Sequence, residues 1–190
     1  GIEHVAGVDE VGRGPLAGPV LAAAVIMPPD VTIRGVHDSK QLTPEKRERL
    51  FHEIRAKALC IGIGGASCRE IDRINILKAS HLAMQRAIRR LRVPPQHVIV
   101  DGLPVAVLGP QHTAVIDGDA KVHCIACASV VAKVVRDRLM KRLATRYPVY
   151  GWEHNVGYAT ADHRLAIDVS GLTPHHRRSF MEQQLMLELV

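Results

Sequence analysis

The sequence has few aromatic residues and few cysteines, and it lacks long hydrophobic runs. Aromatic residues make up 3% of its 190 residues, too few to build the stacking platforms that bind single-stranded nucleic acids. The four cysteines are too few for a disulfide scaffold of this length, so we expect a cytoplasmic protein. The longest apolar run, residues 20–27, ends at two prolines and is far shorter than the roughly 20 residues of a membrane helix. We therefore expect no contact with a membrane.

The charge balance is basic. Lys and Arg number 25 against 19 Asp and Glu, a net charge of +6, with 11 His in addition. This excess favours polyanions as partners, although a solvated basic surface is the alternative. Because aromatic residues are scarce, we expect any nucleic acid to be held by its backbone. No repeat, low-complexity segment or Gly/Ser linker divides the chain, so we expect one domain over residues 1–190.

Hydrophobic periodicity predicts strands and helices in alternation. Strands are expected at residues 5–11, 20–27, 59–67, 98–100 and 114–116, the first two forming a hairpin with a Gly/Pro-rich turn. Helices are expected at residues 44–58, 72–91, 125–147 and 160–169, and after Pro174. This order is typical of an α/β fold in which helices flank a mixed sheet. Residues from about 150 to 190 form a small C-terminal extension of helices and loops.

Four carboxylates lie within or near the ends of expected strands. Asp9 and Glu10 are adjacent in an apolar strand, so they point to opposite faces, and at least one needs a partner such as Arg13. Asp101 follows another strand, and Asp119 comes 18 residues later beside a glycine. Such all-oxygen ligands suit Mg²⁺ or Mn²⁺, and two such ions support phosphodiester hydrolysis. Ordinary Asp-Gly turns, with the Asp9-Glu10 pair balanced by Arg13, are the alternative.

The run DEVGRGPLAGPV at residues 9–20 resembles the opening signature of ribonuclease HII, the type 2 ribonuclease H family. Further segments agree in the same order, at residues 38–42, 71–77, 100–102, 118–119, 128–137, 157–160 and 176–180. This resemblance, which covers nearly the whole chain, implies a ribonuclease H-like sheet and an endonuclease that hydrolyses the RNA strand of RNA/DNA hybrids. It also implies incision on the 5′ side of single ribonucleotides in duplex DNA, leaving a 3′-hydroxyl and a 5′-phosphate.

The resemblance also implies site residues. The family's metal-binding acids correspond to Asp9, Glu10, Asp101 and Asp119, which become the expected catalytic residues and ligands of two Mg²⁺ or Mn²⁺ ions.

Substrate binding is expected at residues 12–14, at Lys40 and at Tyr158. Gly12, Arg13 and Gly14 form a turn whose glycines let the backbone approach a ribose and bond its 2′-hydroxyl. In the family this turn reads the 2′-hydroxyl together with a tyrosine, which corresponds to Tyr158. Lys40 is expected to hold a substrate phosphate as a point charge. A plain turn, a packing tyrosine and a solvated lysine are the alternatives.

Other residues of the matching segments are expected to be structural. We expect Arg136 and Asp137, adjacent on the long helix, to make structural pairs near the site, with Asp137 not a metal ligand. We expect His163 at the surface; support of the site or transfer of protons is the alternative. Cys124 and Cys127 form a CxxC pair with no second pair to complete a zinc site, so we expect them in the core.

The expected partners are RNA/DNA hybrids and ribonucleotide-containing duplex DNA, with a monomer as the default state. Residues 184–190 faintly resemble a peptide that docks into a sliding clamp, although an amphipathic helix end explains them better. Two other functions stay open. A non-catalytic hybrid-binding module would keep the basic surface without the chemistry. Another metal nuclease, such as a junction resolvase, would share the acids but need no ribose-reading turn.

Overall fold

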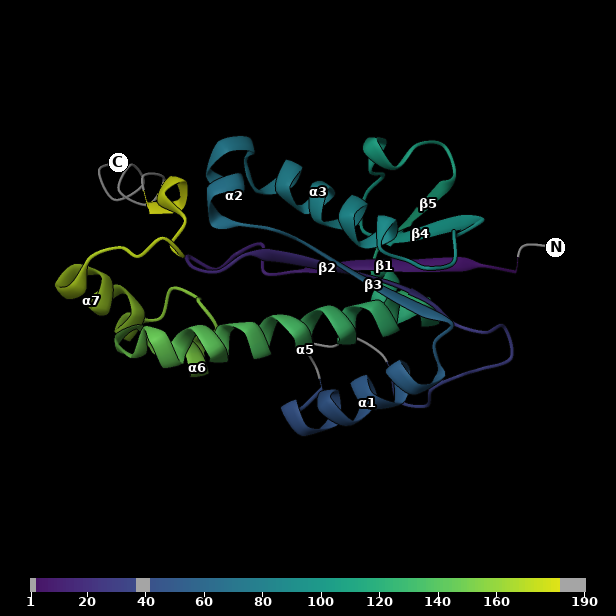
Figure 1. Cartoon of the computed structure of the whole chain (residues 1–190), viewed down its shortest axis with the longest axis horizontal. Coiled ribbons are helices and arrows are strands. Elements are labelled where there is room, and N and C mark those ends of the chain that lie inside the picture. The colour runs from purple at the N-terminus through teal and green to yellow at the C-terminus, as the bar shows by residue number, and fades with distance from the viewer. Residues whose placement is uncertain (1–2, 37–41, 182–190) are drawn as a thin grey trace.

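A five-stranded mixed sheet forms the centre of the computed structural model, which describes residues 3–36 and 42–181. The strands are β1 (Val5–Val11), β2 (Val20–Ile26), β3 (Cys60–Ala66), β4 (His97–Asp101) and β5 (His112–Val115), in the spatial order β3-β2-β1-β4-β5 (Figure 1). The β1-β2 and β2-β3 pairs are antiparallel, whereas β1-β4 and β4-β5 are parallel. These findings confirm the expected hairpin, the mixed sheet and the five strands to within two residues at each end.

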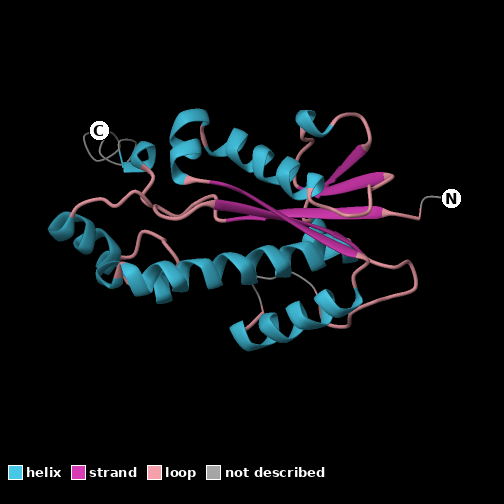
Figure 2. Ribbon diagram, in the orientation of Figure 1, coloured by secondary structure: helices cyan, strands magenta, loops and turns pink. Residues whose placement is uncertain are grey.

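Helices cover both faces of the sheet (Figure 2). One face carries α2 (Cys68–Ile74) and α3 (Ile76–Arg89), and the other carries α5 (His123–Arg146) with α1 (Pro44–Lys57) beside it. The short helix η1 (Ala106–Leu108) lies between β4 and β5, and α4 (Gly118–Lys121) lies between β5 and α5. Beyond α5 follow η2 (Pro148–Tyr150), α6 (Trp152–Asn155) and α7 (Ala161–Ser170). Residues 178–181 are also helical.

The hydrophobic core lies on both sides of β2, which is buried along its whole length. Its residues alternate between two clusters, with Ala24 and Ile26 packing on the α3 side and Ala23 on the α5 side. The strand β1 and the helix α5 approach each other closely at Gly7, where a Cβ would lie 2.2 Å from the backbone carbon of Cys124. Glycine is therefore required there, and it brings the first turn of α5 against β1, two residues before Asp9.

The expected single helix at residues 72–91 is wrong. The structure has two helices, α2 and α3, separated by Asn75, whose φ of 67° breaks the helical path. Ser67 and Glu70 form a capping box that starts α2 earlier than expected, and Asn75 starts α3 by accepting the Lys78 N–H at 3.0 Å. Apolar residues keep a helical spacing across the break, so periodicity did not reveal it.

Only one cysteine of the CxxC pair is fully buried in the core, where both were expected. All four cysteines are free thiols. Cys127 is buried and Cys124 half-buried; burial raises the pKa of both thiols, that of Cys127 to about 12. Within residues 3–36 and 42–181, none of the helices has both the length and the apolar surface needed to cross a bilayer.

Candidate active site

Asp9 and Glu10 lie near the end of β1 and point to opposite faces of the sheet. The carboxylate of Asp9 is buried on the α5 side, where it accepts hydrogen bonds from the Ser129 hydroxyl and, at 2.7 Å, from the Glu10 N–H. Burial, followed by the charge of Glu10, raises the pKa of Asp9 to about 8. Burial also raises the pKa of Glu10, although Arg13 opposes the shift from 3.4 Å. Arg13 is thus the counterion expected from the sequence.

Asp101 adjoins this pair, and Asp119 follows the residue that bonds to Asp101. Asp101 is the last residue of β4, the parallel neighbour of β1, so the two strands carry their acids to the same edge. Its Oδ1 accepts the Gly118 N–H at 2.7 Å, which holds it against the turn that carries Asp119. Asp119 is itself buried in the first turn of α4. The charge of Asp101 contributes to the raised pKa of both Asp9 and Glu10, so these three carboxylates are close neighbours.

The donor atoms of these acids are all carboxylate oxygens, which suits a hard divalent cation. In the part of the chain that the structure describes, however, no three His, Cys, Asp or Glu side chains form a ready-made group of metal ligands. A divalent cation would relieve the mutual repulsion that helps to raise the pKa of Asp9. The acids therefore fit such an ion by chemistry and charge, with some side-chain movement needed to surround it.

The residues expected to bind the substrate gather at the turn that follows β1. Gly12 has a φ of 88°, and a Cβ there would lie 2.1 Å from Nε of Arg136, so only glycine fits. Arg13 and Gly14 are exposed. A Cβ placed on Gly14 would lie 3.7 Å from Cε1 of Tyr158, so the half-exposed tyrosine ring lies beside the turn.

The structure thus brings Tyr158 and residues 12–14 together and, through the contact of Arg13 with Glu10, places them beside the acids. Lys40, the remaining expected substrate contact, lies outside the described residues.

Two buried arginines hold the same turn from inside the protein. Arg136 donates hydrogen bonds to the backbone carbonyls of Ala17, Pro19 and Val156. Arg177 donates to the backbone carbonyls of Gly12, Arg13 and Gly18. Burial lowers the pKa of both guanidinium groups, that of Arg177 to about 10. Apart from the resemblance of residues 176–180, the sequence assigns Arg177 no role, because the carbonyls to which it bonds are distant in the chain.

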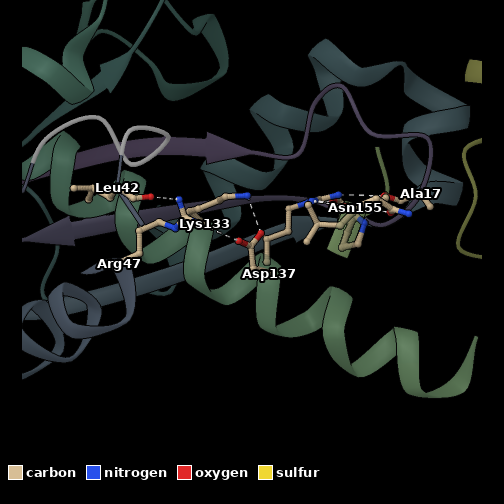
Figure 3. Close-up of polar contacts among 10 residues, drawn as sticks. Ala17, Leu42, Arg47, Lys133, Asp137 and Asn155 are labelled. Carbon is tan, nitrogen blue, oxygen red and sulfur yellow. Dashed lines mark hydrogen bonds and ion pairs between the residues drawn. The ribbon is translucent and has the colours of Figure 1, made fainter. Parts of the chain in front are cut away.

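Asp137 has the structural role expected of it. Lys133 donates a hydrogen bond to its carboxylate at 2.9 Å, and Arg47 approaches it to 4.0 Å (Figure 3). Arg47 also donates to the Leu42 carbonyl at 2.7 Å. The contact of Arg47 with Asp137 ties α1 to α5, whereas Arg136 supports the turn.

The expectation that His163 lies at the surface is wrong, because the residue is fully buried. Its Nδ1 lies 2.8 Å from the Tyr158 carbonyl, and its Nε2 lies 3.0 Å from Nε1 of Trp152 and 3.1 Å from Nε2 of His176. Burial lowers the pKa of His163, and burial and His163 lower that of His176 to about 4. Residues 148–155 fold over the first turn of α7, a packing that no local pattern in the sequence indicates.

Comparisons with known proteins agree with this geometry. The model of the family described as ribonuclease HII matches residues 6–183. The chain is 56% identical over 190 residues to the ribonuclease HII of Thermosynechococcus vestitus, covering 99% of this chain and 88% of the relative. It is 54% identical over 180 residues to the ribonuclease HII of Geobacillus kaustophilus, and the match covers 95% of this chain and 69% of the relative.

Solved structures give the same result. The crystal structure of ribonuclease H2 from Pyrococcus horikoshii superimposes with a TM-score of 0.77 at 30% identity, covering 93% of each chain. The ribonuclease HII in the PCNA:RNase HII complex from Archaeoglobus fulgidus gives 0.76 at 27% identity, covering 92% of this chain and 93% of that one. The fold is therefore ribonuclease H-like, as expected. The chain belongs to the ribonuclease HII family of metal-dependent hydrolases, which act as endonucleases on RNA in RNA/DNA hybrids.

Proposed function

We propose that the protein also cuts duplex DNA on the 5′ side of a single embedded ribonucleotide, leaving a 3′-hydroxyl and a 5′-phosphate. One observation carries this proposal: the ring of Tyr158 lies beside Gly14, in a turn that Arg13 joins to Glu10 over 3.4 Å. Residues suited to read a ribose therefore lie next to carboxylates suited to hydrolyse the adjoining phosphodiester.

In this proposal Asp9, Glu10, Asp101 and Asp119 hold two Mg²⁺ or Mn²⁺ ions. When bound, such ions lower the pKa of a water and stabilise negative charge at the phosphate. The chain's own part is to orient the ligands. Ser129 and the Glu10 N–H fix the carboxylate of Asp9, and the Gly118 N–H fixes that of Asp101. Because burial disfavours the charged form of Asp9, its carboxylate gains strongly from a cation.

Substrate recognition is proposed for the turn and the tyrosine. Gly12 and Gly14 carry no side chain, so a ribose can approach their backbone closely and bond through its 2′-hydroxyl. Tyr158 is 46% exposed and offers a ring face to the sugar of the next nucleotide. The side chain of Arg13 is 51% exposed and can also reach a phosphate. Lys40 is proposed as a second phosphate contact.

The proposal extends to the domain, its partners and its location. Residues 1–190 form one catalytic domain, in which residues from about 150 onward are an extension. The relative from Archaeoglobus fulgidus was solved as a complex with PCNA, and this supports a sliding-clamp contact for the present chain. Residues 184–190, where the sequence suggested such a contact, lie outside the described residues. We propose a cytoplasmic monomer.

A panel of three duplexes tests the proposal: one with a single ribonucleotide, one RNA/DNA hybrid and one of DNA alone, each with Mg²⁺, Mn²⁺ or EDTA. We expect cutting of the first two only, and none with EDTA. Binding without cutting would instead favour the hybrid-binding module. Equal cutting of plain DNA would favour a nuclease that does not read the ribose.

A further inference from the structure

Residues 173–177 link the two groups that are proposed to contact the ribonucleotide, bonding directly to the turn and, through His163, to Tyr158. On one side, the Gly18 N–H donates to the His175 carbonyl and the Arg177 N–H donates to the Leu16 carbonyl, each at 2.8 Å. Ala17 and His176 form an antiparallel bridge between these bonds. The Leu16 N–H in turn donates to the Gly157 carbonyl at 2.8 Å. Three segments that are distant in sequence are thus joined into one layer beneath Tyr158.

Arg177 fixes the turn side of this layer. Its guanidinium donates to the Arg13 carbonyl at 2.7 Å, to the Gly12 carbonyl at 2.5 Å and to the Gly18 carbonyl at 2.8 Å. The side chain is fully buried. A guanidinium is planar and stays charged, so its donors hold these carbonyls in one fixed arrangement. The backbone of residues 12–14 is therefore positioned from within the protein.

His163 and His176 fix the tyrosine side, and their partners assign the ring protons. An indole N–H can only donate, so Nε2 of His163 accepts from Trp152, and the proton of His163 lies on Nδ1. That proton is donated to the Tyr158 carbonyl at 2.8 Å. His176 accepts the Thr173 N–H at Nδ1 and donates from Nε2 to Nε2 of His163, whose single lone pair it shares with the indole N–H of Trp152. Both imidazoles are neutral, and each ring nitrogen has a partner.

We propose that His163 is a positioning residue, backed by His176, that fixes Tyr158 against the turn held by Arg177, and that this spacing sets the preference for a single ribonucleotide. None of the three touches the substrate, since each is at most 2% exposed. The inference rests on the proposed function of Tyr158. A single ribonucleotide offers one register in which its 2′-hydroxyl can be read, whereas a hybrid offers many. Misplacing Tyr158 should therefore impair incision at the single ribonucleotide more.

Two amide substitutions at residue 163 separate the bonds. His163→Asn keeps an N–H near the position of Nδ1, so it keeps the bond to the Tyr158 carbonyl and loses the bonds to Trp152 and His176. His163→Gln keeps an acceptor near the position of Nε2 and loses the bond to Tyr158. The readout is kcat/KM for the single-ribonucleotide duplex divided by kcat/KM for the hybrid. We expect His163→Gln to lower this ratio by about tenfold and His163→Asn to lower it by less than about threefold.

A merely structural role would lower activity on both substrates together and leave this ratio unchanged. Ile54→Val, in the buried cluster between α1 and the sheet, is the control for general loss of stability and should not change the ratio. If Gln leaves the ratio at the wild-type value, or if Asn and Gln lower it equally, the positioning role of the bond to Tyr158 is overturned.

Binding measured with Ca²⁺ in place of Mg²⁺ separates this inference from the proposed reaction. The readout is the ratio of Kd for the all-DNA duplex to Kd for the single-ribonucleotide duplex. We expect Gln to lower this ratio and Asn to keep it. Selective binding by a wild type that cuts nothing, with selectivity lost in Gln, would contradict the reaction and support the inference. If the wild type cuts as proposed but wild type and His163→Gln have equal binding ratios, the positioning inference is overturned and the proposed reaction stands.

Discussion

Replacing Asp9 by Asn should stabilise the protein while abolishing its activity. Burial, and then repulsion by Glu10 and Asp101, disfavour a negative charge on Asp9. Asn has nearly the same shape as Asp but carries no charge, so the substitution removes both costs. The pKa of Asp9 is about 8 in the folded protein and 3.8 as the reference value for the unfolded chain. The folded state thus holds this proton more tightly, and its stability falls as the pH rises from near 4 to about 8.

The size of the effect follows from the pKa difference. At pH 7 the unfolded chain has lost a proton that the folded protein keeps. This difference lowers the free energy of unfolding by up to about 4 kcal/mol. In EDTA, Asp9→Asn should therefore unfold at a higher temperature than wild type, by a margin that grows from pH 5 to pH 8. With Mg²⁺, its turnover should fall at least about a hundredfold.

The assay is thermal unfolding in EDTA at several pH values, beside cleavage of an RNA/DNA hybrid. Asp168→Asn, which removes an exposed carboxylate, should change neither the pH trend nor the cleavage rate. A constant difference in Tm between Asp9→Asn and wild type from pH 5 to pH 8 would refute the reasoning from burial and repulsion.

Three further predictions concern single residues. Asp119→Asn should keep the fold, with a Tm within about 3 °C of wild type, and lose most turnover in the hybrid assay; near-normal cleavage would contradict its role. The pKa of His176 falls from the ordinary 6.5 to about 4 in the folded protein. The free energy of unfolding, measured with urea, should therefore drop by up to about 3 kcal/mol as the pH falls from 6.5 to 4. His176→Asn should not show this drop. Gly12→Ala should lower the free energy of unfolding in the same assay by at least about 2 kcal/mol, because Gly12 has a positive φ and an added Cβ would clash with Arg136. Unchanged stability would refute the close contact.

The sheet and the acidic edge could be predicted because their signals are local. Val98, Ile99 and Val100 are β-branched and precede an Asp-Gly pair, so both the strand and the acid at its end can be seen in a few residues. Adjacent acids in an apolar strand likewise marked Asp9 and Glu10. That these acids meet depends on the parallel pairing of β1 with β4, which the order of elements favoured but did not prove.

The supporting residues could not be predicted, because their partners are distant in sequence. Arg177 contacts carbonyls about 160 residues away, and backbone carbonyls leave no mark in a sequence. His163 is buried by Trp152 and His176, a packing set by tertiary structure rather than by periodicity. The break at Asn75 was missed for the opposite reason, since a local cap interrupts an unbroken apolar pattern.

The central claim is that a 2′-hydroxyl read beside Gly14 and Tyr158 directs hydrolysis by the neighbouring carboxylates. The most direct test compares duplexes that differ at one nucleotide only, carrying a 2′-hydroxyl, a 2′-fluoro group or hydrogen, with the cut mapped to a single bond in the presence of Mg²⁺. The account predicts a cut on the 5′ side of the 2′-hydroxyl nucleotide and none on the other two. Equal cutting of the 2′-fluoro duplex at the same bond would contradict it.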